Sequence, residues 1–184
     1  MPLENDFAIE KKEIVYENLP DGMYNVELFD ISIKEQPKYN EPDPLEKVFT
    51  FQYIVLNEGE YRGRCIWANF IPTYLYISQK NGKNKLYQII ESLHGEMTQA
   101  EESTLNSSFL SSLVGKQCQV MVEIKTKGEK SFNNILKWLF TKNPVTSATE
   151  EEKVKAVVKK KSEDKGFKSL PNKVEEVPLP DFLQ

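Results

Sequence analysis

The sequence has little histidine and cysteine, which removes most of the side chains that catalysis and metal binding use. Its 184 residues include one histidine, His94, and two cysteines, Cys65 and Cys118. A single histidine cannot anchor a histidine-based metal cluster, and the two cysteines are too far apart in the chain to be typical of a zinc ligand pair. At the predicted end of a helix, His94 is better explained by its favourable interaction with the helix dipole.

The sequence also lacks the motifs of nucleotide-dependent enzymes. Neither GxxxxGK[ST] nor GxGxxG occurs. Carboxylates are plentiful but scattered over predicted turns and the C-terminal part, so no pair of them stands out as a general acid and base. We therefore expect a protein that is not an enzyme and that has no cofactor and no metal.

Long apolar segments are missing as well. No run of about 18 apolar residues, the length that a membrane helix needs, is present. The first residues do not show the basic and then apolar pattern of a secretory signal. The two cysteines are therefore expected to be reduced thiols, and the protein to be cytoplasmic without membrane contact.

The sequence also has no excess of positive charge, whereas a simple nucleic-acid-binding protein would be basic overall. The chain has 24 Lys+Arg against 28 Asp+Glu, a net charge of −4. The charges are unevenly distributed, however. Residues 125–142 hold five lysines and one glutamate, a net of +4, and residues 153–173 hold eight lysines and two acids, a net of +6. Residues 174–184 hold three acids and no base, a net of −3.

Composition changes sharply near residue 143 and suggests three parts. Aromatic and β-branched residues recur throughout the chain up to this point, whereas 145–184 contains two aromatic residues. We predict a flexible N-terminal lead over 1–12, a folded domain over 13–143, and a disordered, lysine-rich linker with an acidic tip over 144–184. A helix over 151–161 would be transient, because few of its residues are apolar.

Within the domain, the patterns are mostly those of strands. Five segments are rich in β-branched and aromatic residues and bounded by turn signals, namely 22–31, 47–56, 61–71, 117–126 and 132–140. Three prolines predict a loop over 35–45. One convincing helix is predicted over 83–94, where apolar residues recur at i, i+3, i+4 and i+7, and a short helical turn over 107–113.

The order of these elements predicts the fold class. Three strands, one helix and two strands are the arrangement of an OB-fold, a five-stranded barrel that binds oligonucleotides through one face and two loops. We therefore predict a mainly β, OB-fold-like nucleic-acid-binding domain with its helix between the third and fourth strands. The turn over 127–130 would be the loop between strands 4 and 5.

Three clusters combine basic side chains with aromatic or amide groups, the two requirements of single-strand binding. The candidate nucleic-acid-binding residues are Arg62, Arg64, Trp67, Asn69 and Tyr74 in the first cluster, Lys80, Lys83 and Lys85 in the second, and Lys125, Lys127, Lys130, Phe132, Asn134, Lys137 and Trp138 in the third. Alternate residues of a strand face opposite sides, so not all of them can contact a ligand. The alternatives are that Trp67 packs beneath the helix, that the second cluster is a solvated loop, and that the aromatics of the third face the core.

The C-terminal tip combines acids with apolar residues. Its candidate partner-binding residues are Glu175, Glu176, Pro180, Asp181, Phe182 and Leu183. Apolar side chains gain nothing at a flexible end unless they bury on a partner, so this tip is predicted to be a short docking peptide. The alternative is an accidental apolar end.

Several segments carry a family resemblance. LPDGMYNV (19–26), FQYIVL (51–56) and GEYRGR (59–64), followed by LVGKQCQVMV (113–122) and SFNNI (131–135), resemble a family of small phage proteins that are encoded among recombination and replication genes. The resemblance covers roughly 19–142 and implies an OB-fold single-stranded DNA-binding protein. The tip also resembles the C-terminal tip of bacterial and phage single-stranded DNA-binding proteins, which recruits replication and repair proteins. It differs in having Leu183-Gln184 after the phenylalanine and few acids before it.

The function expected from these features is non-catalytic, largely sequence-independent binding of single-stranded DNA in phage replication or recombination. The protein would act in the cytoplasm of a phage-infected or lysogenic bacterium and would dock replication or recombination proteins through its tip. The alternative is an adaptor that recruits a recombinase, helicase or nuclease without binding DNA tightly itself. A homo-oligomer is left open, as are the nucleotide site size and the preference for DNA over RNA.

Overall fold

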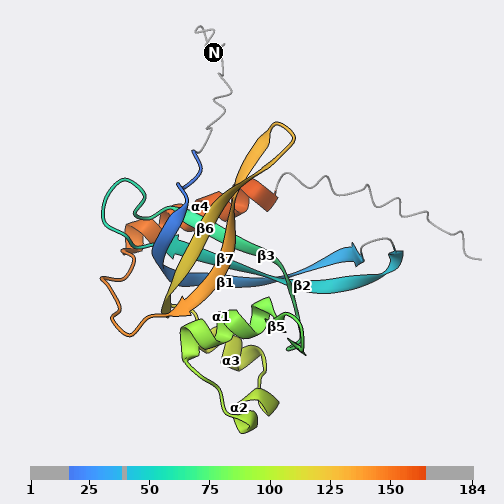
Figure 1. The fold of residues 1–184 in the computed structure, drawn as a ribbon. Helices are drawn as coiled ribbons and strands as arrows, with labels where there is room; N and C mark the ends of the chain where they lie inside the picture. The colour runs from blue at the N-terminus through green and yellow to red at the C-terminus, as the bar shows by residue number, and fades with distance from the viewer. Residues whose placement is uncertain (1–16, 39–40, 165–184) are drawn as a thin grey trace, which may run out of the picture.

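Five strands form one antiparallel sheet in the order β3-β2-β1-β6-β7 (Figure 1). The structure is a computed structural model, and it describes residues 17–38 and 41–164. The strands of the sheet are β1 (Gly22–Lys38), β2 (Glu41–Val55), β3 (Cys65–Pro72), β6 (Gln117–Lys127) and β7 (Lys130–Phe140). A two-stranded hairpin follows β3 and consists of β4 (Ile77–Ser78) and β5 (Gly82–Lys83). The helices are α1 (Lys85–His94), α2 (Gln99–Ser103), α3 (Ser107–Ser112) and α4 (Glu150–Asp164).

The prediction of a mainly β fold with five sheet strands is confirmed, but two of its details are wrong. A closed barrel is not found, because no ladder joins β3 to β7 among the described residues. The helices are also placed differently from the single helix that was expected. Three helices, α1 to α3, lie between β3 and β6, and α4 follows the last strand.

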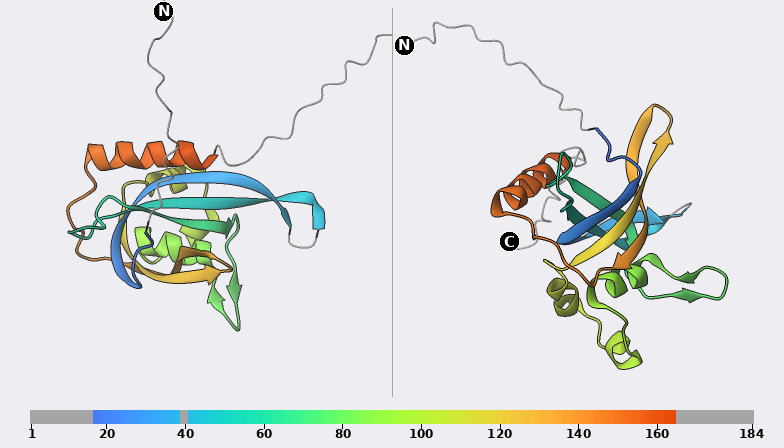
Figure 2. Two further views of the ribbon diagram at one scale, coloured as in Figure 1. Left: turned by 90° about the horizontal axis from the view of Figure 1, so that it is seen from above. Right: turned by 60° about the vertical axis from the view of Figure 1, so that its left-hand side comes forward.

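Strand β2 separates two apolar clusters, because its alternate side chains face opposite sides of the sheet. Phe51 and Tyr53 are buried in the main core with the apolar face of α1. Ile54 and Leu56 belong to a second cluster on the other side, together with Ala156 of α4. Figure 2 shows α4 running along the outside of the sheet, away from α1. Burial on both sides explains why the chain is apolar without interruption from Tyr53 to Leu56, at the end of β2.

Helix α1 forms where its apolar stripe predicted it. Asn84 caps its first turn by accepting a hydrogen bond from the backbone N–H of Tyr87. Leu86, Ile89 and Leu93 are buried against the sheet. This helix fills one end of the space enclosed by the curved sheet, and its first residue lies near the edge strands.

The β1–β2 hairpin is longer than predicted, so the loop expected over 35–45 is wrong. β1 continues to Lys38, and Pro37 lies opposite Leu45 in the ladder. The outer part of the hairpin has no third strand, since β3 pairs with β2 only from Val48 onward. A proline in such a two-stranded ribbon breaks no hydrogen bond to a further strand. Figure 2 shows this ribbon extending beyond the rest of the sheet.

The chain after β7 also differs from the expected disorder. Residues 144–164 belong to the fold, and α4 begins with a capping box in which Thr149 and Glu152 bind each other's backbone N–H groups. Ala148 is buried beside the sheet. The lead predicted over 1–12 and the tail from 165 onward lie outside the described residues. None of the helices in the described part of the chain is long and apolar enough to cross a membrane.

Candidate nucleic-acid interface

A groove of about 760 Å³ lies between the edge strands β3 and β7. We call it the β3–β7 groove. Its walls come from four parts of the chain: residues 17–19, the residues from 64 to 70, the first residue of α1, and the first half of β7. Six residues that the sequence singled out for nucleic-acid binding line it together, namely Arg64, Trp67, Asn69, Lys85, Phe132 and Asn134.

Residues 17–19 connect the two edge strands where a ladder is missing. Asn133 of β7 accepts a hydrogen bond from the N–H of Leu19 at 2.9 Å, and its amide donates to the carbonyl oxygen of the same residue at 2.7 Å. From the other side, Arg64 donates to the carbonyl oxygen of Glu17 at 2.7 Å. Leu19 itself is buried in the core. We call residues 17–19 the strap, because they link Arg64, next to β3, to β7 without a ladder between the two strands.

Two cations and one carboxylate line the groove. Arg64 and Lys85 contribute positive charge, and Glu17 contributes one negative charge. Arg64 also lies over the ring of Tyr61, with its guanidinium carbon 5.0 Å from the ring centroid. The ring and the strap engage part of this guanidinium, and no further partner of its N–H groups is found among residues 17–38 and 41–164.

Three aromatic side chains line the groove, and one of them was not predicted as a site residue. Trp67 is partly exposed, and Phe132 is 45% exposed. The third, Phe70, has the same parity along the strand as the buried Ile66 and Ala68, so strict alternation would place it on the inward side. A bulge in β3 changes this parity, because Phe51 pairs with Ala68 but Phe49 pairs with Ile71. Nothing in the sequence signals this extra residue.

Trp138 does not belong to the interface, which corrects the prediction that it stacks on bases. It lies opposite Val120 and is only 6% exposed, within the main core. Tyr53 is buried in the same cluster, and this burial raises the pKa of its hydroxyl well above the ordinary value. Of the two aromatic residues predicted on β7, Phe132 is therefore the exposed one and Trp138 is a core residue.

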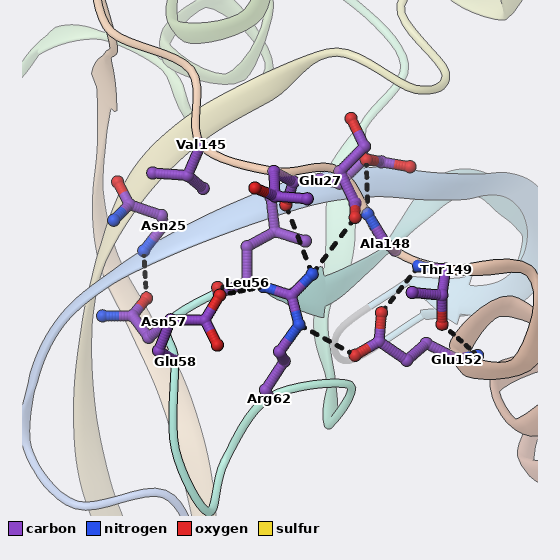
Figure 3. A network of polar contacts seen from close by, with 12 residues as sticks. Asn25, Glu27, Leu56, Asn57, Glu58, Arg62, Val145, Ala148, Thr149 and Glu152 are labelled. Carbon is purple, nitrogen blue, oxygen red and sulfur yellow. Dashed lines mark hydrogen bonds and ion pairs between the residues drawn. The ribbon is translucent and has the colours of Figure 1, made fainter.

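Arg62 is the second correction, because it is bound on the side of the sheet that carries α4 (Figure 3). Its guanidinium donates to the carbonyl oxygens of Leu56 at 2.7 Å and Ser147 at 3.1 Å. It also forms ion pairs with Glu152 at 3.1 Å and Glu58 at 3.2 Å. The side chain is only 15% exposed. Arg62 thus fastens α4 to the turn after β2 and offers no free donors to a phosphate.

The remaining predicted cations lie outside the groove. Lys83 forms an ion pair with Glu91 at 2.6 Å and lies over the ring of Tyr87. Lys125 forms an ion pair with Glu123 at 3.0 Å, and Asn134 donates to the same carboxylate. The hydrogen bond from Lys125 lowers the pKa of Glu123; burial opposes this effect, and the hydrogen bond from Asn134 and the charge of Lys125 add to it. These lysines are partly neutralised.

Other candidates are not among the residues that line the groove. Lys80 lies in the turn of the β4–β5 hairpin, while Lys127 and Lys130 flank the turn of the β6–β7 hairpin. Lys137 pairs with Met121 on the outward side of the sheet, and Tyr74 is 61% exposed after the end of β3. The six predicted partner-binding residues of the tip lie outside the described residues. They are Glu175, Glu176, Pro180, Asp181, Phe182 and Leu183.

Groups that could support metal or thiol chemistry are few in the described part of the chain. No cluster of histidine, cysteine, aspartate or glutamate suitable for a metal ion occurs there. Neither Cys65 nor Cys118 forms a disulfide within the described residues. Burial raises the pKa of Cys118 to about 12, so this thiol stays protonated, whereas Cys65 is partly exposed at the groove.

A scan against protein-family models found no matching family, and a search of curated proteins found no matching relative. What the protein binds has therefore to be inferred from the chemistry of the groove.

Proposed function

We propose that this protein is a non-catalytic, largely sequence-independent single-stranded DNA-binding protein of OB-fold type that acts in phage DNA replication or recombination. The observation that carries the proposal is the composition of the β3–β7 groove. Two cations, Arg64 and Lys85, and three aromatic side chains, Trp67, Phe70 and Phe132, line one groove. Cations that follow a phosphate backbone and rings that stack on unpaired bases are the two parts of a single-strand site.

The strand order supports the same proposal. In an OB-fold, oligonucleotides bind on the face of strands 2 and 3 and between the loops that join strands 1 to 2 and 4 to 5. β3 is the third strand of this sheet, and the β6–β7 hairpin occupies the place of the loop between strands 4 and 5. This hairpin brings the exposed Lys127 and Lys130 to the end of the strand that carries Phe132. OB barrels are partly open, so an unpaired β3–β7 edge is compatible with the proposal.

The small positive charge of the groove predicts binding that weakens only modestly as the salt concentration increases. Each phosphate contact releases counterions, so for a single strand the logarithm of the binding constant falls with the logarithm of salt by about 0.7 per contact. Arg64 and Lys85 together would give a slope of about −1.4, and the hairpin lysines would make it steeper. Stacking on the aromatic rings does not depend on counterion release, so part of the affinity should persist at high salt.

The two tryptophans make a direct test of the proposal. Trp138 is buried, so quenching of tryptophan fluorescence by oligo-dT should come from Trp67. We expect quenching that saturates at low salt and weakens as salt increases. Trp67→Phe should lose most of this signal while still binding a dye-labelled oligo-dT, measured by anisotropy. Absence of binding by either method at low salt would refute the proposal.

Strand β7 offers a matched pair of variants for the same experiment. Phe132 and Phe140 have similar exposure, 45% and 51%, but only Phe132 lines the groove. They are eight residues apart, which is about 26 Å along a strand. Phe132→Ala should weaken oligo-dT binding by about 1–3 kcal/mol, the value of stacking on one base, and Phe140→Ala should leave the affinity unchanged.

One observation favours the alternative of a protein-interaction adaptor. Met23 lies opposite Met121 on the outward side of β1 and β6, and both side chains are about 40% exposed. Leu139 is exposed on the neighbouring strand. Exposed apolar side chains in one region suit a protein partner. If the folded protein binds no oligonucleotide at low salt, the adaptor is the better explanation, and partner docking by the tip would be its counterpart.

A further inference from the structure

The backbone at Phe70 is unusual for its residue type. Its φ is +59°, and every other residue of the described chain with positive φ is a glycine. For an L-residue this conformation brings Cβ close to the following carbonyl oxygen, so it is disfavoured and persists only where the surrounding structure enforces it. Residues held in this way concentrate at binding and catalytic sites.

The surroundings of the Phe70 side chain do not explain why a phenylalanine occupies this position. Its exposure of 70% is the highest of any large apolar side chain in the described residues. Its neighbours in β3 show the opposite behaviour, since Ala68 and Ile71 are buried in the main core. An exposed ring gains little from hydrophobic burial, so neither packing nor backbone preference favours phenylalanine at this position.

The bulge in β3 determines where the ring is displayed. Asn69 and Phe70 together lie opposite the single residue Thr50, because the pairing shifts between Phe49 and Phe51. Without the extra residue, alternation would place position 70 on the inward side with Ala68. The bulge instead leaves Phe70 exposed at the β3–β7 groove, which Arg64 and Lys85 also line. Bulges often redirect a side chain next to a functional site.

We infer that Phe70 is a base-stacking residue of the groove and that the strained bulge is retained because it presents this ring to the ligand. The inference rests on the proposed function. It adds a specific claim, that one residue keeps an unfavourable backbone conformation because that conformation improves ligand binding. A residue that tolerates positive φ but lacks a ring should then keep the fold and lose affinity.

The test compares three substitutions in the full chain, with binding to dye-labelled oligo-dT followed by anisotropy at low salt and stability followed by thermal denaturation. Phe70→Asn removes the ring with a residue that tolerates positive φ. We expect its affinity to fall roughly 5- to 140-fold, which is the stacking range of about 1–3 kcal/mol at 1.4 kcal/mol per tenfold. Phe70→Gly should behave in the same way, and Phe70→Trp should bind within about twofold of the parent.

The melting temperature distinguishes a Phe70 ring that is exposed for ligand binding from one that stabilises the fold by packing. The melting temperatures of Phe70→Asn and Phe70→Gly should equal or exceed that of the parent, because strain is relieved and little buried area is lost. Phe140→Asn is the control, since it makes the same substitution at an exposed ring outside the groove, 51% exposed against 70% for Phe70, and its affinity should not change.

Three results would contradict the inference in different ways. If the parent binds oligo-dT and Phe70→Asn binds equally well, the ring does not contact bases, but the proposed function stands. If Phe70→Asn melts at a clearly lower temperature, the ring is structural and its display is not the reason for the bulge. If the parent does not bind at all, the proposed function fails and the inference fails with it.

Discussion

Arg62 and Arg64 are two residues apart, yet the structure gives them opposite roles. Arg62 is held by three backbone carbonyl oxygens and two carboxylates on the side of the sheet covered by α4. Arg64 makes one hydrogen bond to the strap and faces the groove. Gly63 between them has a φ of +78°. The comparison shows that a basic side chain is available to a ligand only where the fold has not already satisfied its donors.

The two tryptophans repeat this difference between the groove and the interior. Trp67 lines the groove, whereas Trp138 is 6% exposed in the core. Their sequence surroundings are similar, since each lies within a few residues of a basic side chain, Arg64 before Trp67 and Lys137 before Trp138. Residue type therefore identified the pool of candidates, and the register of each strand decided which of them face the groove.

The largest expected effect separates the two tryptophans by stability. Trp138→Ala should lower the free energy of unfolding by about 3–5 kcal/mol, because it leaves a cavity in the core. Trp67→Ala removes a partly exposed ring and should cost much less. Urea denaturation followed by circular dichroism measures the free energy of unfolding of both variants, because the circular dichroism signal does not depend on the tryptophan that is removed. Equal losses for the two variants would mean that Trp67 is as much a core residue as Trp138.

The second prediction is that replacing Arg62 lowers stability, whereas replacing Arg64 lowers the affinity for oligo-dT. Arg62→Ala should destabilise the protein by about 2–3 kcal/mol, because Glu152 and nearby carbonyl oxygens lose their partner in a mostly buried position. Its affinity for oligo-dT should change little under conditions where the variant is folded. Arg64→Ala should cost little stability but weaken binding and reduce the steepness of the salt dependence by about 0.7.

The readouts for this pair are a melting curve and an oligo-dT titration at several salt concentrations. If Arg62→Ala alone lowered the salt slope, the assignment of the two arginines would be reversed. Lys137→Gln is a suitable control, since it removes an exposed positive charge on the outward side of β7.

The sequence was informative where periodicity persisted along an element. The strands over 117–126 and 132–140 and the helix over 83–94 all appear within a few residues of their predicted bounds. Periodicity was misleading at bulges, because one extra residue reverses the side to which all later side chains point. This is why Phe70 was missed.

The structured chain after β7 was missed for a different reason. The helix over 151–161 was predicted to be only transient, because few of its residues are apolar. The helix is in fact held by small and polar groups: Ala148 and Ala156 pack against β2, and Arg62 binds Glu152. A signal was present in the capping box Thr149-Glu150-Glu151-Glu152. The partner that stabilises it, Arg62, could not be identified without the three-dimensional structure.

The smallest expected effect is the pH dependence of the interaction between Arg62 and Glu152. Partial burial would by itself raise the pKa of Glu152, but the hydrogen bonds from Thr149 and the charge of Arg62 outweigh it and lower the pKa below the ordinary value of 4.5. The folded-state pKa is thus the lower one, so this stabilisation is present above about 4.5 and is lost as the pH falls through the lowered pKa. Glu152→Gln should therefore melt at a lower temperature than the parent at pH 7, and the difference should shrink toward pH 3.

Glu150→Gln is the control, because the side chain of Glu150 is 90% exposed in the same helical turn, and its melting temperature should follow that of the parent at both pH values. If the difference between Glu152→Gln and the parent did not change with pH, the carboxylate of Glu152 would not be what fastens α4 to Arg62.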